Sequence, residues 1–531
     1  PALVEGAGLF IFPGGGDVLA SAGWMEAGLP PDTKLMATLF VSPFYGLHLV
    51  CCPNCNGRCF PYAWPDDETG ENTVRLDILR MQNYRCFGEF EIDFDPHLTI
   101  LIASNGGGKT TILDAARVAL WPFVKGFDLG GQTGKSATIQ IEDVRLAQFG
   151  SGNMESQVPS VIEAKGVWWE SAVESSWLQQ RVSLKKSTNT IGDAGSKALT
   201  LYGKSLQDSV RSDAHVTLPM MTYLGTSRLW FEGRFSSAAA QTTLDKSEYS
   251  RTSAYLNCLS YSSSFKTFTA WYIWMYRSYR EAQLIALERG EEVSDTGQRF
   301  EKIISAVKEA IDRLIKAPTG WHRLEYSASH QQQLVMHHPD QGILPVEMLS
   351  DGLRNTIAMV ADLAFRACKL NPHLGERAPL QTPGIALIDE VDMFLHPFWQ
   401  QTIVGSLRAA FPAMQFIVTT HSPQVLSTVR RENIRVIGKD AQGRLIASRP
   451  LAMTYGEPSN SVLRSVTQVD PQPPVDEKPG LLQLTEWVDK GRYDEPQAIL
   501  LMQQITEALT EQHPQLQRLQ RSIKRQKALR G

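Results

Sequence analysis

The feature that most constrains the fold is a glycine-rich loop between a predicted strand and a predicted helix. The apolar run at residues 98–102 predicts a buried strand, and residues 111–120 have the apolar spacing of a helix. In such a loop, glycines let backbone N–H groups close around phosphate oxygens, a lysine reaches the β- and γ-phosphates, and a hydroxyl ligates Mg²⁺. The order strand, loop, helix therefore predicts a phosphate-binding P-loop at residues 103–110.

The P-loop has one departure from the strict pattern and one competitor in the chain. Ala103 stands where the pattern has its first glycine, which the turn tolerates if the local φ is negative. A second Gly-Lys-Ser triplet occurs at residues 134–136, but residues 137–141 predict a strand, so no helix N-terminus would face a phosphate there. We therefore expect ATP to bind at the first loop, through Ser104, Asn105, Gly106, Gly107, Gly108, Lys109, Thr110 and Thr111.

Two further strand-like runs end in polar side chains. Residues 385–388 are apolar and lead into Asp389 and Glu390, the pattern of a buried parallel strand that delivers two carboxylates. We expect Asp389, with Thr110, to hold Mg²⁺, and Glu390 to polarise the attacking water. The second run, residues 416–419, leads to His421, which can reach a γ-phosphate, although alone such a histidine is as often a core residue or a helix cap.

A fourth segment, residues 349–353, indicates a function only in combination with the other three. Residues 349–353 precede an amphipathic helix and offer Ser350 as its N-cap, which by itself predicts only a helix start. In their order along the chain, the P-loop, this segment, the two carboxylates and His421 resemble the ABC-type ATPases of the RecF, SMC and Rad50 class. The resemblance covers about residues 75–430 and implies an α/β P-loop ATPase head, with a mixed sheet flanked by helices.

The resemblance also implies how the site is completed. In that class, the signature segment of one subunit caps nucleotide held by the P-loop of another, so hydrolysis needs a head-to-tail dimer. Ser350 and Gly352 would then act on the partner's ATP. Within one subunit, the catalytic residues would be Lys109, Glu390 and His421.

Two absences narrow the resemblance. The chain has no long heptad arrays of the kind that build SMC and Rad50 arms, and no Asp-x-Asp between His421 and Gly531, where overcoming-lysogenization nucleases carry a metal-binding domain. The short helical insertion, residues 349–354 and the tail with residues 454–456 look most like the PtuA-type ATPases of Septu and retron anti-phage systems. That resemblance implies an HNH nuclease partner and, in retrons, a reverse transcriptase with its RNA–DNA product.

Three functions remain open at this point. The chain could be a defence ATPase that controls a nuclease, a RecF-like repair ATPase that acts directly on DNA, or a scaffold that binds ATP without hydrolysing it. With 52 Lys and Arg against 56 Asp and Glu, the net charge of −4 gives no global basic field, so any nucleic-acid contact must be local. No clean apolar run of about 18 residues and no secretory pattern occur, so we expect a cytoplasmic protein without membrane contact.

Composition and periodicity divide the chain into five segments. A loop rich in Ser, Ala and Thr at residues 231–253 precedes two predicted helices, and a Pro-rich run at residues 470–480 indicates a linker. The expected segments are an extension with a cysteine cluster (1–72), ATPase lobe I with the P-loop (73–228), a loop with a helical insertion (229–320), ATPase lobe II (321–430), and a strand and helical appendage (431–531).

Three features allow two interpretations each. Cys52, Cys55 and Cys59 could bind zinc with a fourth ligand, but without a second Cys pair reduced structural cysteines are the alternative. Aromatic residues between Trp271 and Tyr279 could stack on bases or pack in the core. The acid-free basic run from Arg518 could be a solvated helix end or a nucleic-acid or partner contact.

Overall fold

The computed structural model describes a subset of the chain: residues 20–24, 36–40, 74–129, 136–150, 152–168, 174–186, 190–229, 250–261 and 265–530. The chain divides into two compact units, Pro1–Glu71 and Asn72–Gly531. In the first unit, strands β1 (Ala20–Trp24) and β2 (Met36–Phe40) pair antiparallel. The expected zinc ligands Cys52, Cys55 and Cys59 lie outside the described residues.

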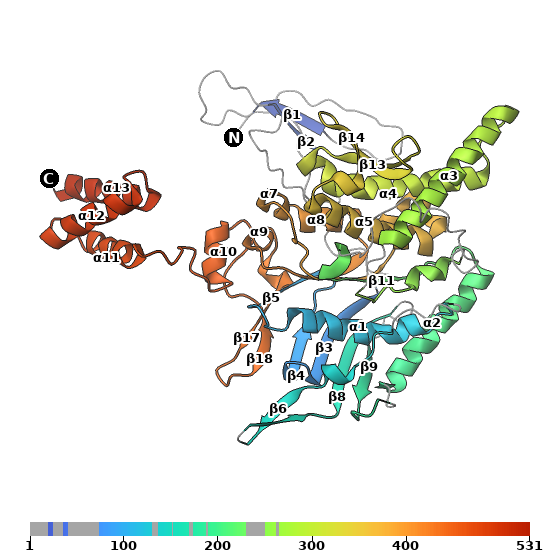
Figure 1. The fold of residues 1–531 in the computed structure, drawn as a ribbon, viewed down its shortest axis with the longest axis horizontal. Helices are drawn as coiled ribbons and strands as arrows, with labels where there is room; N and C mark the ends of the chain where they lie inside the picture. Colours follow the sequence, from blue (N-terminus) through green and yellow to red (C-terminus); the bar gives the residue numbers. More distant parts are fainter. Residues whose placement is uncertain are drawn as a thin grey trace. The chain divides into compact units, whose positions relative to one another are not determined.

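The second unit is built on a six-stranded mixed sheet (Figure 1). Its first five strands are parallel neighbours and its last strand is antiparallel. Four of its strands are buried along their whole length, which explains their near-continuous apolar sequences. In spatial order the strands are β11 (Met220–Leu224), β15 (Gly384–Ile388), β16 (Met414–Thr419), β5 (Leu98–Ile102), β17 (Ile434–Lys439) and β18 (Leu445–Ser448).

A second, antiparallel sheet lies on the other side of helix α1 (Lys109–Lys125), which therefore packs between two sheets (Figure 1). Strand β8 alternates buried and half-buried residues, as expected of a strand with one face on the core. Trp177 anchors the sheet to the helix, because its indole N–H donates to the Ala119 carbonyl at 2.7 Å. The strands are β10 (Ile191–Gly192), β9 (Glu174–Arg181), β8 (Ser160–Val167), β3 (Arg75–Tyr84) and β4 (Phe87–Asp93).

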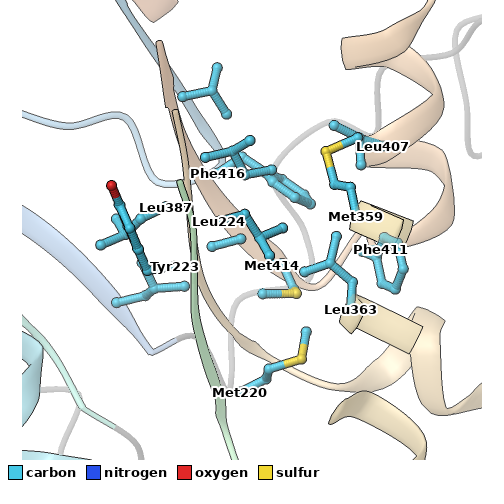
Figure 2. Packing of buried hydrophobic residues seen from close by; sticks show 14 of the residues in the cluster. Met220, Tyr223, Leu224, Met359, Leu363, Leu387, Leu407, Phe411, Met414 and Phe416 are labelled. Carbon is cyan, nitrogen blue, oxygen red and sulfur yellow. The ribbon is translucent and has the colours of Figure 1, made fainter. Parts of the chain in front are cut away.

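Helices cover the opposite face of the six-stranded sheet. Helix α5 (Asp351–Leu370) packs against β11 and against α4 (Asp295–Thr319), and α3 (Phe265–Arg289) packs against both helices. Figure 2 shows Met359 and Leu363 of α5 facing the apolar side chains of β11 and β16. Each sheet face is thus covered by an apolar helix, which is how a mixed α/β sheet buries both sides.

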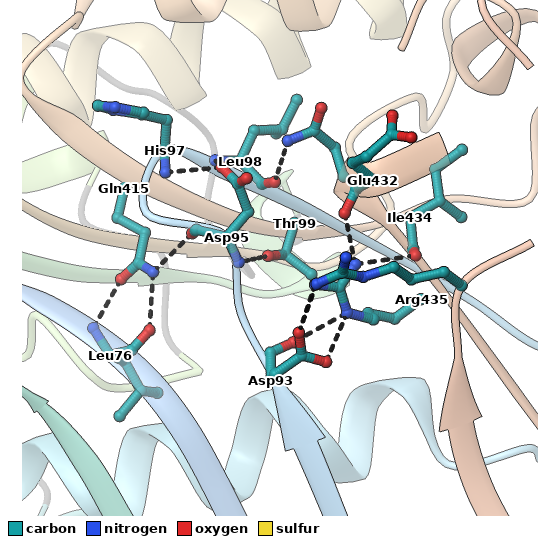
Figure 3. Close-up of polar contacts among 12 residues, drawn as sticks. Leu76, Asp93, Asp95, His97, Leu98, Thr99, Gln415, Glu432, Ile434 and Arg435 are labelled. Atoms are coloured by element: carbon teal, nitrogen blue, oxygen red, sulfur yellow. Dashed lines mark hydrogen bonds and ion pairs between the residues drawn. The ribbon is translucent and has the colours of Figure 1, made fainter. Parts of the chain in front are cut away.

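Gln415 joins the two sheets through a buried polar contact (Figure 3). Its side chain accepts a hydrogen bond from the Leu76 backbone N–H at 2.8 Å and donates to the carbonyls of Leu76 and Asp95 at 2.8 and 2.9 Å. This glutamine is 2% exposed, and its two hydrogen bonds to Leu76 are buried. The contact satisfies backbone groups that burial would otherwise leave unpaired.

An ion pair stands close to this contact. The guanidinium of Arg435, 1% exposed, donates from Nε and Nη2 to the two carboxylate oxygens of Asp93 at 2.9 and 2.8 Å (Figure 3). Partial burial alone would raise the pKa of Asp93, but the hydrogen bonds and charges of Arg435 and Arg449 outweigh it. The pKa of Asp93 therefore lies below its ordinary value.

The remaining elements surround this core. Helices α11 to α13 pack around an apolar cluster of their own, Leu481, Leu484, Val488, Tyr493, Ala498, Ile505, Leu516 and Leu519. The other helices are α2 (Ala194–Ser212), α6 (Ala378–Gln381), α7 (Pro397–Gln400), α8 (Ile403–Ala410), α9 (Pro423–Leu426), α10 (Ser459–Ser465), α11 (Lys478–Asp489), α12 (Pro496–Leu509) and α13 (Pro514–Arg530). The remaining strands are β6 (Leu146–Phe149), β7 (Asn153–Ser156), β12 (His322–Ser327), β13 (Gln333–His338) and β14 (Gly342–Pro345).

The expected fold class is confirmed: an α/β unit with a mixed sheet, a helical insertion and C-terminal helices. One local prediction is wrong, because residues 137–141 form no strand. The backbone of Ile139 hydrogen-bonds to side chains and not to a neighbouring strand. Its N–H donates to the Thr190 hydroxyl, and its carbonyl accepts from the Arg181 guanidinium. Residues 230–249 of the expected loop lie outside the described residues. None of the described helices combines the length and apolar content that a membrane crossing requires.

Candidate nucleotide-binding site

The P-loop connects β5 to α1 and has the backbone conformation that its glycines permit. Gly106 and Gly108 have φ of 74° and 94°, the left-handed region that favours glycine. A Cβ on Gly108 would lie 2.5 Å from the ring of Phe87, and one on Gly107 would lie 2.7 Å from the Cβ of Ala103. Ala103 itself avoids positive φ, which is the condition under which alanine fits the first position. Side chains at positions 107 and 108 would therefore collide with the loop's own neighbours, so the loop requires glycine there.

Lys109 is the first residue of α1 and is held at the loop. Its ammonium group donates to the Ala103 carbonyl at 3.1 Å, and the residue is 8% exposed. Burial lowers the pKa of Lys109, while the charges of Asp389 and Glu390 oppose that shift. An incoming phosphate would supply this buried ammonium group with a further negative charge at hydrogen-bonding distance.

Three side chains from three different elements meet around Asp389. The carboxylate follows β15, is 3% exposed, and accepts hydrogen bonds from the hydroxyls of Thr110 at 2.9 Å and Thr419 at 2.6 Å. Thr110 belongs to α1 and Thr419 ends β16, the strand between β5 and β15. A carboxylate and a hydroxyl in contact supply the oxygen donors that Mg²⁺ prefers, so this pair fits that ion.

Glu390 turns the chain at the end of β15. Its φ is 47°, and its backbone N–H donates to the Thr419 hydroxyl at 2.7 Å. The next residue, Val391, donates its N–H to the Thr419 carbonyl at 3.0 Å. A single threonine therefore fixes the backbone direction at Glu390 and, through its hydroxyl, the carboxylate of Asp389.

His421 follows β16 by two residues and is exposed. Because β5, β15 and β16 run parallel, their carboxyl ends meet at one edge of the sheet. The structure therefore brings Lys109, Thr110, Asp389 and Glu390 to the edge where His421 stands. The neighbouring Ser422 caps α9, so the cap alternative belongs to the serine and not to the histidine.

The signature segment begins α5, on the face of the sheet opposite α1. Ser350 is the N-cap residue, as expected, yet its exposed hydroxyl makes no capping hydrogen bond. Gly352 is buried, and a Cβ there would lie 2.4 Å from the Phe394 carbonyl oxygen. Asn355 adds a hydrogen bond from its side-chain amide to the Met393 carbonyl at 3.0 Å. The start of α5 is thus held against the segment that follows Glu390.

Sequence reasoning missed a polar cluster on α1. The Asp114 carboxylate, with a side chain 3% exposed, accepts hydrogen bonds from Arg85, Arg117 and the Tyr261 hydroxyl. Arg85 also donates to Asp143 at 2.8 Å. This cluster ties α1 to the turn that precedes β4 and to the segment that precedes α3. The sequence signal was an aspartate and an arginine three residues apart, Asp114 and Arg117, within a largely apolar stretch of helix.

The described residues also decide the aromatic alternative. Trp271 is buried with its ring 4.9 Å from that of Phe365, and the buried Tyr272 donates its hydroxyl to the Leu324 carbonyl. Core packing is therefore confirmed for Trp271 and Tyr272. Among the described residues, no group of His, Cys, Asp and Glu could hold a metal ion by itself.

Two domain families match the chain. A family described as "AAA domain" matches residues 79–317, which contain the P-loop. A second, described as "AAA domain, putative AbiEii toxin, Type IV TA system", matches residues 231–427, which contain the signature segment, both carboxylates and His421.

Two curated relatives align over most of their own length. The retron Vc95 probable ATPase of Vibrio cholerae serotype O1 biovar El Tor is 25% identical over 73% of this chain and 78% of that protein. The retron Ec83 probable ATPase of Escherichia coli is 24% identical over 77% of this chain and 79% of that protein. The Septu protein PtuA of Bacillus mycoides (strain KBAB4) is 41% identical over 15% of this chain and 10% of that protein.

Among solved structures, an SMC head bound to the C-terminal winged-helix domain of ScpA aligns with 70% of this chain and 98% of that chain, at 14% identity and a TM-score of 0.41. The AAA matches span both halves of the candidate site, and the retron relatives align over about three quarters of the chain. The chain is therefore an ATPase that is similar to the retron ATPases and to PtuA.

Proposed function

We propose that this chain is the ATP-hydrolysing subunit of an anti-phage defence complex, and that it dimerises around ATP to control a partner nuclease. The observation that carries the ATPase part is the meeting of Lys109, Thr110 and Asp389 at one edge of the sheet. The similarity of this chain to retron ATPases over most of its length supports the proposed role in anti-phage defence.

Within one subunit, each site residue has a role that its geometry supports. The P-loop amides and Lys109 bind phosphate. For the amides to surround a phosphate the backbone must turn tightly, and glycine permits this at the two positions with positive φ. Within the loop and the start of α1, residues 104–108 and Thr111 would contact the phosphates. Thr110 and Asp389 hold Mg²⁺, which would neutralise charge on the β- and γ-phosphates.

Glu390 and His421 complete the catalytic half-site. Glu390 accepts a proton from the attacking water at its carboxylate. Its backbone turns at positive φ, and Thr419 hydrogen-bonds both to this backbone and to the Asp389 carboxylate. The proposed base therefore lies next to the proposed metal ligand. His421 is exposed at the same edge and contacts the γ-phosphate. Both roles require the correct order of strands, because β16 separates β15 from β5.

The second half of the site comes from another copy of the chain. Ser350 is exposed, its hydroxyl makes no cap within its own helix, and α5 covers the opposite face of the sheet from α1. Ser350 and Gly352 of one subunit therefore bind the γ-phosphate held by the other. Hydrolysis then separates the two subunits and changes what they hold.

The partner that this cycle controls is an HNH nuclease, as in PtuA-type systems. In a retron, a reverse transcriptase and its RNA–DNA product would join the complex. ATP binding and hydrolysis occupy residues 73–228 and 321–430. The insertion at 229–320 and the appendage at 431–531 remain for holding or releasing these partners.

The test is to purify tagged Glu390→Gln protein from its native cell in the presence of ATP and to identify every co-purifying protein and nucleic acid. Lys109→Ala serves as the matched control, because it loses the phosphate-binding ammonium group and should lose ATP-dependent partners. Recovery of an HNH nuclease supports the proposal. Recovery of chromosomal DNA with recombination proteins alone contradicts it and favours a RecF-like repair ATPase.

A further inference from the structure

Helix α13 presents a strongly basic face that the ATPase cycle does not use. Residues 514–530 contain no Asp or Glu. Leu516 and Leu519 face the apolar cluster shared with α11 and α12, and the Gln526 side chain donates to the Val488 carbonyl at 2.8 Å. One face of the helix is therefore fixed inward. The basic residues of this helix are Arg518, Arg521, Lys524, Arg525, Lys527 and Arg530.

Four of these cations form one stripe on the outward face. At 3.6 residues per turn, Arg518, Arg521, Lys524 and Arg525 fall on the side opposite Leu516 and Leu519. All four are exposed. The stripe from the first to the last rises about 10 Å along the helix axis.

Among the described residues, few acidic groups are placed to neutralise the stripe. Two acidic residues of the same helical bundle pair elsewhere, Glu486 with Lys490 at 2.5 Å and Glu495 with Arg492 at 2.7 Å. Asp494 approaches Lys527, which lies outside the stripe, at 3.8 Å. Within the part of the chain that the structure describes, no ion pair involves Arg518, Lys524 or Arg525.

Helix stability does not explain this arrangement. The helix dipole favours cations only in the last turn, so it accounts for Lys527 and Arg530 and not for Arg518 or Arg521. Arg521 and Arg525 stand four residues apart, where like charges repel one another along a helix. Repulsion within the stripe therefore lowers the stability of the helix by itself. An anion bound from outside would offset this repulsion.

We propose that the stripe formed by Arg518, Arg521, Lys524 and Arg525 binds the phosphate backbone of a nucleic acid. Protein interfaces need an apolar centre, whereas here the residues between the cations are polar, with Gln517 and Gln520 beside them. The exposed Leu529 lies beyond the stripe, at the end of the helix. Polar, positively charged surfaces without apolar side chains are typical of contacts to phosphates. The contact is independent of sequence and of ATP hydrolysis, and it extends the proposed function to direct nucleic-acid binding.

The experiment compares full-length proteins by fluorescence anisotropy on a labelled 30-bp DNA duplex, a single strand and an RNA–DNA hybrid, each over a series of salt concentrations. The test variant carries Arg521→Gln, Lys524→Gln and Arg525→Gln, because glutamine keeps the helix propensity while removing charge. The matched control carries Arg289→Gln, Arg299→Gln and Arg444→Gln, which removes the same charge from exposed positions elsewhere. A third variant, Arg521→Lys with Lys524→Arg and Arg525→Lys, keeps the charge.

The test variant should bind at least one of the three nucleic acids about tenfold or more weakly at low salt, and its slope of log affinity against log salt should fall by about 2 to 3. The control and the charge-keeping variant should bind like the wild type. Equal binding by the test variant, or an equal loss in the control, overturns the proposal. Binding of polyglutamate in place of all three nucleic acids would indicate an acidic protein partner and also overturns it. The ATPase rate, measured on the same samples, reports separately on the proposed function.

Discussion

The hydroxyl of Thr110 donates a 2.9 Å hydrogen bond to the carboxylate of Asp389, a residue 279 positions later in the chain. The two residues come from the start of α1 and the end of β15, which parallel strands bring to a common edge. Without this contact, the P-loop and the acidic strand end would be two separate motifs. With it, they form one candidate Mg²⁺ site.

Thr110→Val should weaken Mg²⁺ binding while keeping the shape of the side chain. Valine removes one of the oxygen ligands proposed for Mg²⁺, so the Mg²⁺ concentration for half-maximal ATP hydrolysis should rise about tenfold or more. Thr110→Ser keeps the hydroxyl and should stay close to the wild type. A titration of phosphate release against Mg²⁺ measures both, and equal curves for valine and wild type would contradict the assignment.

Glu390→Gln should bind ATP but hydrolyse it about 10²–10⁴-fold more slowly, because the amide cannot accept the proton of the attacking water. Fluorescent-nucleotide binding and steady-state phosphate release measure the two properties separately. The exposed Glu288→Gln on α3 makes the same chemical change away from the site and should hydrolyse ATP normally. Undiminished hydrolysis in Glu390→Gln would remove Glu390 as the base.

Gly352→Ala should reduce hydrolysis without abolishing ATP binding, because the new methyl group meets the Phe394 carbonyl oxygen at 2.4 Å and must displace the start of α5. Overpacking of this kind also costs about 1–3 kcal/mol of stability. Gly438→Ala is the matched control, since a Cβ there has open space around it. Hydrolysis, nucleotide binding and urea unfolding of both variants should separate the two effects, and a fully active Gly352→Ala would refute the constraint.

Gln415→Leu should destabilise the protein by about 2–5 kcal/mol, because it leaves the Leu76 backbone groups and the Asp95 carbonyl without their buried partner. Gln442→Leu changes an exposed glutamine in the turn between β17 and β18 and should have little effect. Urea denaturation at constant pH gives both values. A wild-type midpoint for Gln415→Leu would mean that the two sheets do not depend on this side chain.

The ion pair of Asp93 and Arg435 predicts a pH dependence. The pKa of Asp93 is lowered in the folded state, so its contribution to stability is complete above the unfolded value near 3.8 and is lost as pH falls through the folded value. Asp93→Asn should therefore unfold at lower urea than the wild type at pH 7, by about 0.5–1 kcal/mol, because solvent screens the half-exposed Asp93 carboxylate. The difference between the two proteins should shrink below pH 4, and a difference that stays constant would contradict the linkage.

Much of the site could be predicted from the sequence because its motifs are local. The P-loop is recognised from a strand, glycines and a helix within about 25 residues, and the structure places them in that order. Asp389 could be placed near Thr110 because parallel strands end at one edge. The roles of Glu390, His421, Ser350 and the other site residues remain predictions for the experiments above.

What the sequence could not reveal depends on contacts between distant segments. Asp114 has one partner nearby in the sequence, Arg117, but its other partners, Arg85 and Tyr261, approach it only in the folded protein. The failure at residues 137–141 has the same origin. Their alternating pattern is that of a strand, but the backbone of Ile139 finds Thr190 and Arg181 as partners, and no neighbouring strand pairs with it.

The two hydrogen bonds of the Thr419 hydroxyl hold Asp389 and Glu390 next to each other in the folded protein. One bond is donated to Asp389 and the other is accepted from the backbone of Glu390. Both follow from the register of β16 against β15, which is set during folding. The spacing between the proposed metal ligand Asp389 and the proposed base Glu390 is thus set by the fold before any nucleotide arrives.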